Sequence, residues 1–298
     1  MFEHDILSDE AIREGLPTRF VGQHVVHFET IDSTNRVAKA LGRDGAPDGT
    51  LVIAEAQTEG RGRLGRQWLA PPGSSLLLSL LFRSAVHARG LPLHVQAAHL
   101  TMICSLAVTD AIDHTAHLRA RLKWPNDILL GHKKAGGILT ELVFQDDGLD
   151  FVVVGIGLNV NVDFRQANEA YPPDAAPDTS QASLTALTER STSLLLESGQ
   201  RASRRPLLQR LLTQVEHRYL AWRAGWLPHE EWRERLATLG QQVTVTAPDR
   251  IVVGLAEDVD TDGALLVRVA DGSLVRVLSG DVTLRTASAT PGPLGPDR

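Results

Sequence analysis

The chain has 298 residues, 43% of them apolar and 22% charged, so it can bury a sizeable core and is neither disordered nor fibrous. Its formal net charge of -6 argues against a general nucleic-acid binder, because such proteins gain most of their affinity from basic side chains that neutralise phosphates. Any cationic chemistry must therefore be local. The length favours one large domain, or a large domain with a small one.

The single cysteine, Cys104, lies in an apolar run, which excludes a disulfide framework and a cysteine-based zinc site. We expect a buried core thiol. The N-terminus is acidic and lacks an apolar signal core, and no stretch approaches the ~18 apolar residues of a membrane span. These features predict a cytoplasmic protein that does not bind a membrane.

The first half of the chain predicts two helices and two strands. Residues 32–34 can cap a helix that ends near Gly42. Residues 50–57 are typical of a strand, and residues 74–82 form a continuous apolar run that predicts a buried strand. Apolar residues then recur at helical spacing over 91–118, which predicts a long helix against the sheet.

Three strand-like runs follow, over 118–130, 134–144 and 150–161, and Asn-Asp, Lys-Lys and Asp-Gly turns interrupt them. Strands therefore cluster in the sequence, which favours an α+β fold over a regular βαβ repeat. A polar, proline-rich loop is expected over 165–182, with helices after it as far as residue 239.

The C-terminal part changes character. Short apolar runs separated by Pro-Asp and Asp-Gly turns predict a small all-β barrel. The predicted domains are a large domain over 1–237, a barrel over 238–286 and a disordered tail over 287–298. One turn, D-V-D-T-D-G at 258–263, matches the first half of an EF-hand loop, but Val269 stands where the bidentate Glu is needed, so a hairpin turn is expected.

A segment of interleaved glycine and arginine, G-R-G-R-L-G-R-Q-W, occupies residues 60–68. Its spacing satisfies the dinucleotide pattern G-x-G-x-x-G, but Pro71 and Pro72 leave no room for the helix that this pattern must open. A P-loop is excluded because Arg66 and Gln67 stand where Lys and Ser/Thr are required. An RG-rich nucleic-acid segment is disfavoured between two buried strands. Taken alone, the loop could be a solvated turn.

Other polar segments make a plain turn less attractive. K-W-P-N-D-I at 123–128, K-K-A-G-G-I-L at 133–139 and G-I-G-L-N-V-N at 155–161 each place charged, amide or glycine groups at a strand end. Together with D-S-T-N at 32–35, they can converge on one end of a sheet and form a binding site.

In these motifs and their order, the chain resembles the biotin–protein ligases, enzymes that attach biotin to a lysine of carboxylase carrier domains. The shared motifs are D-S-T-N, A-E-A-Q ahead of G-R-G-R-x-G-R-x-W, K-W-P-N-D, K-x-x-G-I-L and G-I-G-x-N. The resemblance extends from about residue 25 to 286. It implies an α+β fold in which a mixed β-sheet ligase core, similar to class II synthetases, is packed with helices and followed by a small SH3-like β-barrel.

The resemblance implies a two-step reaction. The biotin carboxylate attacks the α-phosphate of ATP, which releases pyrophosphate and leaves biotinyl-5'-AMP, and a carrier lysine then takes the biotin. ATP and Mg²⁺ are the implied cofactors, with biotin as a substrate. Because the first step brings a carboxylate against a polyphosphate, cations must hold the two together, and arginine forks suit both groups.

The same resemblance assigns residues to roles. The catalytic residues are Arg63, Lys134 and Asp127, and Asp127 is also assigned to Mg²⁺ or to the incoming amine. Lys134 is chosen over Lys133 by its spacing to A-G-G-I-L. The biotin-binding residues are Ser33, Thr34, Asn35, Gln57, Gly60, Arg61, Gly62, Arg63, Lys134, Gly137 and Gly155. The ATP-binding residues are Arg63, Arg66, Trp68, Lys123, Asn126, Asp127 and Asn159.

Three alternatives are weighed against this interpretation. A lipoate or octanoate ligase performs the same kind of chemistry, but the Gly/Arg segment, K-W-P-N-D and the terminal barrel favour biotin. A transcriptional repressor is disfavoured because only about 20 residues precede the ligase core, as in the short bacterial type without a DNA-binding domain. A non-catalytic biotin-binding module is disfavoured by the nucleotide-side residues. The expected partner is a biotin carboxyl carrier protein, without DNA or membrane, and a homodimer is left open.

Overall fold

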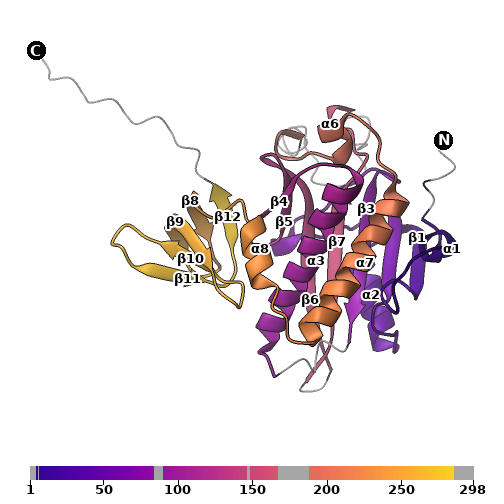
Figure 1. Ribbon diagram of the computed structural model, residues 1–298, viewed down its shortest axis with the longest axis horizontal. Coiled ribbons are helices and arrows are strands. Elements are labelled where there is room, and N and C mark those ends of the chain that lie inside the picture. Colours follow the sequence, from indigo (N-terminus) through magenta and orange to yellow (C-terminus); the bar gives the residue numbers. More distant parts are fainter. Residues whose placement is uncertain (1–4, 6, 84–89, 146–147, 167–187, 285–298) are drawn as a thin grey trace, which may run out of the picture.

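The structure is a computed structural model, and it describes residues 5, 7–83, 90–145, 148–166 and 188–284. The first half of the described chain contains α1 (Asp9–Arg13), β1 (Val25–Ile31), α2 (Thr34–Arg43), β2 (Leu51–Gln57), the 3-10 turn η1 (Arg63–Gly65), β3 (Ser75–Phe82) and α3 (Leu93–Thr115). Helices α1 and α2 are short, whereas α3 runs the length of the sheet (Figure 1).

A seven-stranded mixed sheet forms the larger part of the molecule. Its remaining strands are β4 (Ala120–Lys123), β5 (Asp127–Leu130), β6 (Lys133–Gln145) and β7 (Gly148–Asn159). The strand order is β1-β2-β3-β7-β6-β5-β4, with β1 and β2 parallel and the other neighbours antiparallel. The sheet is mixed because β1 and β2 are parallel strands joined through α2, whereas β4, β5 and β6 are antiparallel and follow one another through short turns.

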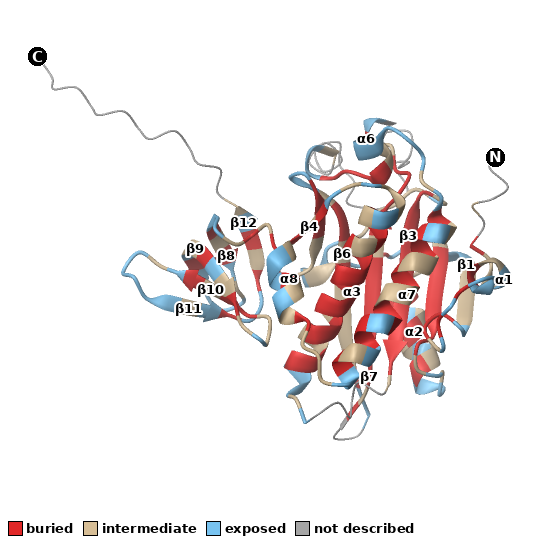
Figure 2. Cartoon of the chain, in the orientation of Figure 1, coloured by how far each residue is buried: buried red, intermediate tan, exposed pale blue. Residues whose placement is uncertain are grey.

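Helices α3 and α7 (Arg204–Arg223) cover one face of this sheet, and α2 packs on the opposite face (Figure 1). Strand β3 is buried along its whole length because both of its faces are covered. Figure 2 shows buried residues in β3 and along α3. By length and composition α3 could cross a membrane, but 78% of its most apolar window is buried inside the protein.

The single cysteine of the chain is part of the core. Cys104 lies on α3 and is fully buried, and this burial raises its pKa. The prediction of an unreactive core thiol agrees with this environment, since the nucleophile is the thiolate.

The second half of the described chain contains η3 (Phe164–Gln166), α6 (Leu194–Ser198), α7 and α8 (His229–Arg235). A five-stranded antiparallel sheet ends it, formed by β8 (Gln242–Thr246), β9 (Ile251–Val259), β10 (Leu265–Arg268), β11 (Leu274–Val277) and β12 (Asp281–Leu284). This confirms the α+β prediction with a C-terminal β unit. Most of the predicted 165–182 loop and the 287–298 tail lie outside the described residues.

The five-stranded sheet is fastened to the larger one through the turn after β9. The indole Nε1 of Trp124 donates to the Gly263 carbonyl at 2.9 Å, and His99 Nε2 lies 2.8 Å from the Thr261 carbonyl. This turn joins the antiparallel strands β9 and β10 and is the hairpin that was predicted in place of an EF-hand loop. The carboxylates of Asp260 and Asp262 pair with Arg276.

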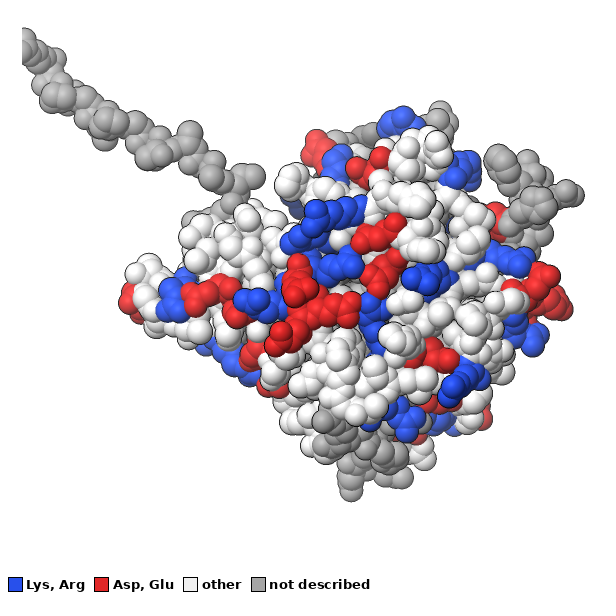
Figure 3. Space-filling model, in the orientation of Figure 1, with Lys and Arg blue, Asp and Glu red and all other residues white. Residues whose placement is uncertain are grey.

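Charged side chains of both signs are interspersed over the α3/α7 face (Figure 3). Several pair between helices: Arg218 of α7 bonds to Asp110 of α3, and Arg235 of α8 bonds to Asp110 and Asp113 at 2.8 and 2.7 Å. These contacts tie the three helices together rather than presenting a uniformly basic surface on this face.

Two elements near the N-terminus were absent from the sequence predictions. Helix α1 and the edge strand β1 precede the first motif, in a part of the chain for which no element was expected. Strand β1 has the signature of an edge strand, with apolar and polar residues mixed in V-V-H-F-E-T-I and only partial burial.

Candidate active site

One large cleft, with a volume of about 1710 Å³, lies at the α2 face of the mixed sheet. The structure brings all the residues assigned from the motifs to its lining. A single small ligand usually occupies a pocket of roughly 300–1,000 Å³, so this cleft has room for two substrates side by side.

The Gly/Arg segment, residues 60–68, forms a small hairpin at the rim of the cleft. Its two arms pair at Arg61 and Gln67, and the backbone N–H of Gly62 donates to the Arg66 carbonyl at 2.7 Å. At its tip Leu64 has a φ of 57° and is 68% exposed. A tight turn of this kind lets arginine side chains project from both arms, and no helix follows it.

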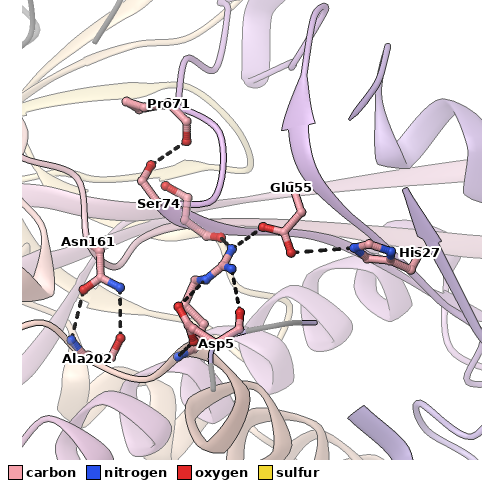
Figure 4. A network of polar contacts seen from close by, with 9 residues as sticks. Asp5, His27, Glu55, Pro71, Ser74, Asn161 and Ala202 are labelled. Carbon is pink, nitrogen blue, oxygen red and sulfur yellow. Dashed lines mark hydrogen bonds and ion pairs between the residues drawn. The ribbon is translucent and has the colours of Figure 1, made fainter. Parts of the chain in front are cut away.

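A buried polar network supports the strand from which this hairpin emerges. Glu55 of β2 lies between His27 of β1 and the guanidinium of Arg204 (Figure 4). Arg204 Nη1 donates to Glu55 at 2.5 Å, and its Nε donates to Asp5 at 2.9 Å. The start of α7 is thereby fixed to the strand that carries Gln57 two residues later.

The three arginines of the hairpin have different surroundings. Arg63 points inward, and its Nη1 donates to Asn126 Oδ1 at 3.2 Å and to the Gly280 carbonyl at 3.3 Å. Burial lowers its pKa, against the attraction of Asp127. Arg66 forms an ion pair with Asp281 at the start of β12. Arg61 is exposed like Arg66, and its Nη2 lies 3.9 Å from Glu59 Oε2.

Two lysines complete a cationic cluster with Arg63. Lys134 Nζ lies 2.6 Å from Asp127 Oδ1 and 5.6 Å from the centroid of the Trp68 ring. Burial lowers the pKa of Lys123, and the charges of Lys134 and Arg66 act in the same direction, while Asp127 opposes them. One carboxylate faces several cations, so the cluster favours a bound anion.

The other end of the cleft is polar but uncharged. The N–H of Thr34 donates to Gln57 Oε1 at 2.8 Å, and Asn35 lies beside Gly155 of β7. A Cβ at Gly155 would overlap Asn35 Oδ1 and lie 2.9 Å from its Cγ, and one at Gly157 would lie 2.6 Å from the Trp68 ring. Glycine is therefore required at both places to make room for these side chains.

Two buried polar atoms in the cleft have no partner among the described residues. They are the Oδ1 of Asn159, whose Nδ2 donates to the Thr192 carbonyl at 3.0 Å, and the Nε1 of Trp68. Buried polar groups are nearly always hydrogen-bonded. An open acceptor and an open donor on the cleft wall therefore indicate places where a ligand completes the bonding.

Sequence reasoning missed part of the cleft. Asp281 and the next three residues of β12 line it, although they belong to the C-terminal sheet, and so do residues 189–191 from beyond the proline-rich segment. Neither segment carries a motif. Their approach depends on how the two sheets pack, and the ion pair between Arg66 and Asp281 joins positions 215 residues apart.

The cleft offers few protein ligands for a magnesium ion. The described residues contain no group of three or more His, Cys, Asp or Glu side chains placed to hold a metal ion. Asp127 is the one carboxylate among the assigned nucleotide residues, and it already pairs with Lys134. Magnesium commonly binds through one or two carboxylates together with substrate phosphates, so Asp127 suits an ion that arrives with a polyphosphate.

Comparisons with known proteins agree with this geometry. The biotin/lipoate A/B protein ligase family model matches residues 27–159, and the biotin protein ligase C-terminal domain model matches residues 238–285. The biotin–[acetyl-CoA-carboxylase] ligase of Mycobacterium tuberculosis is 37% identical over 257 residues, which cover 84% of this chain and 85% of that protein. The bifunctional ligase/repressor BirA of Bacillus spizizenii is 32% identical over 280 residues, covering 93% and 79% respectively.

The fold is also similar to a solved one. A biotin protein ligase from Aquifex aeolicus, in complex with biotin and ATP, superposes with a TM-score of 0.68 at 24% sequence identity. The match covers 89% of this chain and 100% of that one. Both sheets therefore belong to an arrangement that is known from experiment.

Proposed function

The chain belongs to the biotin/lipoate A/B protein ligase family, and from that premise we propose how its cleft activates biotin and passes it on. Its activity is ATP-dependent biotin–protein ligation: biotin is adenylated to biotinyl-5'-AMP with release of pyrophosphate, and then transferred to a lysine of a biotin carboxyl carrier protein. The observation that supports this most strongly is one cleft with an uncharged polar end and a cationic end.

Adenylation needs cations at one point. A carboxylate oxygen of biotin attacks the α-phosphorus of ATP, and the bond from that phosphorus to the bridging oxygen breaks, so that pyrophosphate leaves. Both reactants are anionic, and negative charge gathers on the α-phosphate oxygens as the new bond forms. In our proposal Arg63 and Lys134 hold the carboxylate against the α-phosphate, while Lys123 and Arg66 reach the departing phosphates.

The hairpin arginines can move into place because their present contacts are replaceable. Arg63 donates to one amide oxygen and one carbonyl oxygen, and Arg66 is held by an exposed ion pair to Asp281. Exposed ion pairs contribute little to stability, roughly 0–1 kcal/mol, so a polyphosphate can compete for Arg66. Gly60, Gly62 and Gly65 give the backbone the freedom to close.

Biotin fills the uncharged end in this proposal. Its bicyclic ring is apolar with a polar ureido edge, which suits Ser33, Thr34 and Gln57. This end is completed by Asn35, the backbone at Gly137 and the flat surface at Gly155. Arg61 closes it from the side of the hairpin.

The nucleotide base is assigned to the wall with the open acceptor. Asn159 Oδ1 can accept a hydrogen bond from an exocyclic 6-amino group, which adenine carries and a 6-oxo purine such as guanine replaces by an oxygen. Trp68 supplies an aromatic wall, and Asn126 Oδ1 accepts a hydrogen bond from Arg63.

The second step transfers biotin to the carrier lysine. A free lysine amine has a pKa of about 10.4, so it must lose a proton before it attacks the carbonyl carbon of the adenylate, from which AMP leaves. Asp127 lies 2.6 Å from the Lys134 ammonium at the same place, and we assign it to orient the incoming amine.

This assignment predicts that Asp127→Asn slows transfer from preformed biotinyl-5'-AMP by about 10²-fold, because general acid–base groups contribute on that order. Single-turnover transfer to a carrier domain measures it. Asp281→Asn is the control, since that carboxylate pairs with Arg66 rather than Lys134. Unchanged transfer by Asp127→Asn would remove the residue from this step.

The lowered pKa of Lys123 predicts that ATP binding depends on pH. Its side chain attracts phosphate only while protonated, and burial lowers its pKa, so the free enzyme loses this charge at lower pH than an ordinary lysine would. Bound phosphate favours the charged form, and the affinity for ATP therefore falls as pH rises through the lowered pKa. We expect the KM for ATP to rise in the alkaline range below the ordinary lysine pKa of about 10.4.

The Lys123→Arg variant tests this cause, because arginine stays charged throughout that range. Its KM for ATP should vary less with pH than that of the unmodified protein. An identical alkaline rise in both proteins would assign the effect to another group.

Biotin-dependent ATP/pyrophosphate exchange tests the proposed reaction. Exchange of label from pyrophosphate into ATP should require biotin, since adenylation is the reversible step. Exchange with lipoate but not biotin would instead support the related lipoate chemistry of the same family.

The partner and the setting are also proposals. We propose that the acceptor is an exposed hairpin lysine of a biotin carboxyl carrier domain, that the enzyme works in the cytoplasm, and that it acts without DNA, in keeping with its net charge of -6. The edge strand β1 leaves a homodimer open. Light scattering on the protein as it elutes from a size-exclusion column, with and without biotin and ATP, measures its oligomeric state.

A further inference from the structure

We propose that Arg190 is a further binding residue of the adenylation step, and that it holds the two phosphates that leave as pyrophosphate. Arg190 belongs to none of the motifs and follows the proline-rich segment in the chain. The inference rests on the proposed function, because it concerns how the ATP end of the same cleft is completed. It assigns Arg190 to the leaving group rather than to biotin.

The backbone immediately after Arg190 is fixed between two strands of the mixed sheet. Ser191 forms a parallel bridge with Lys134 of β6, and the N–H of Thr192 donates to the Lys134 carbonyl at 2.9 Å. The Thr192 carbonyl accepts from Asn159 Nδ2 of β7 at 3.0 Å. Both strand residues are assigned to the reacting groups or to the nucleotide. Arg190, two positions before Thr192, is therefore placed at the ATP end of the cleft.

Burial changes abruptly at Arg190. Ser191 and Thr192 are buried, with exposed fractions of 7% and 1%, whereas Glu189 and Arg190 are exposed. Residues 189–191 all line the cleft. The chain thus leaves the core at the cleft wall, and Arg190 can contact a ligand there without loss of core packing.

Arg190 lies close to a cation that we assign to the departing phosphates. Burial is the main cause that lowers the pKa of Lys123, and the positive charge of Arg190 acts in the same direction. The guanidinium is therefore near enough to Lys123 for the two charges to repel each other. A polyanion that contacts both side chains replaces this repulsion by attraction.

The ion pairs of the cleft distinguish Arg190 from its neighbours. Lys134 pairs with Asp127, and Arg66 pairs with Asp281, so an incoming phosphate must compete with a carboxylate at each of them. The ion pairs among the described residues do not include Arg190. Within that part of the chain, a phosphate has no carboxylate to displace from it.

The chemistry of the leaving group explains what this cation would do. As the bond from the α-phosphorus to the bridging oxygen breaks, negative charge gathers on that oxygen and stays with pyrophosphate. A guanidinium offers parallel N–H donors that match two phosphate oxygens. Arg190 should therefore bind ATP and free pyrophosphate, but it has no contact to make with biotinyl-5'-AMP, which has lost those two phosphates.

The Arg190→Ala variant tests this in biotin-dependent ATP/pyrophosphate exchange. We expect the KM for pyrophosphate and the KM for ATP to rise about 10-fold each, as for the loss of one charge-assisted contact, with the KM for biotin unchanged. Single-turnover transfer from preformed biotinyl-5'-AMP to a carrier domain should keep its rate, because pyrophosphate takes no part in that step. Arg190→Lys keeps the charge without the fork, so its KM values should rise less.

Arg201→Ala is the matched control, because Arg201 is also an exposed arginine but does not line the cleft. It should leave all of these values unchanged, and an equal rise in this variant would overturn the proposal in favour of an effect of net charge. An unchanged KM for pyrophosphate in Arg190→Ala would also overturn it. Equal rises in the KM for biotin and the KM for ATP, or slower transfer from the preformed adenylate, would overturn it in favour of a structural role. An unmodified protein without biotin-dependent exchange would instead contradict the proposed function.

Discussion

Replacement of Arg63 by alanine is expected to slow biotin-dependent ATP/pyrophosphate exchange by about 10²- to 10³-fold, the usual cost of removing one group that stabilises charge in a transition state. Arg63 is the hairpin arginine that is turned inward, where it contacts Asn126 and the Gly280 carbonyl. The loss should appear mainly in kcat, because the charge on the α-phosphate oxygens grows as the carboxylate attacks.

Arg63→Lys is the matched variant for this prediction. It retains a positive charge but loses the planar fork, so its exchange rate should fall between those of the unmodified protein and Arg63→Ala. Exchange at the full rate in Arg63→Ala would mean that the cationic cluster does not act on the reacting atoms. A rise confined to the KM for biotin would place Arg63 in ground-state binding instead.

The second large effect is expected from Gly155→Ala. The added methyl group would overlap Asn35 Oδ1, and Asn35 cannot move aside because Glu141 and Leu139 hold its amide. Overpacking of this kind costs about 1–3 kcal/mol, so we expect the biotin affinity to fall by roughly 10- to 100-fold. ATP affinity, measured on the same protein, is the internal control.

A double-mutant cycle identifies the cause of that loss. In an Asn35→Ala background the new methyl group has space, so Gly155→Ala should lower the free energy of unfolding less than it does in the unmodified protein. Denaturant unfolding measures both differences. Equal destabilisation in the two backgrounds would show that the clash is elsewhere.

The sequence predicted those parts of the fold whose signals are local. Strand β3 was predicted within one residue of its start because a run of apolar residues admits little else, and α3 begins two residues inside its predicted range, after Pro92. Helix α1 and strand β1 escaped prediction because α1 is one turn long and β1 is a half-buried edge whose pairing with β2 is a tertiary contact.

The same distinction between local signals and tertiary contacts applies to the site. Motifs were sufficient to bring together part of the cleft lining, because glycines and polar side chains at strand ends carry their own signal. The motifs did not predict which charged side chains pair with one another. The contact between Lys134 and Asp127 depends on the register of β5 with β6, and the contact between Arg66 and Asp281 depends on the packing of the two sheets.

The most direct test of the account is the mass of the adenylate that forms when the protein is given ATP with equal amounts of biotin and lipoate. After rapid quenching, mass spectrometry should find biotinyl-5'-AMP in large excess, and added carrier domain should consume it while gaining the mass of biotin. Accumulation of lipoyl-5'-AMP instead, or of no adenylate, would contradict the assignment of the uncharged end of the cleft to biotin.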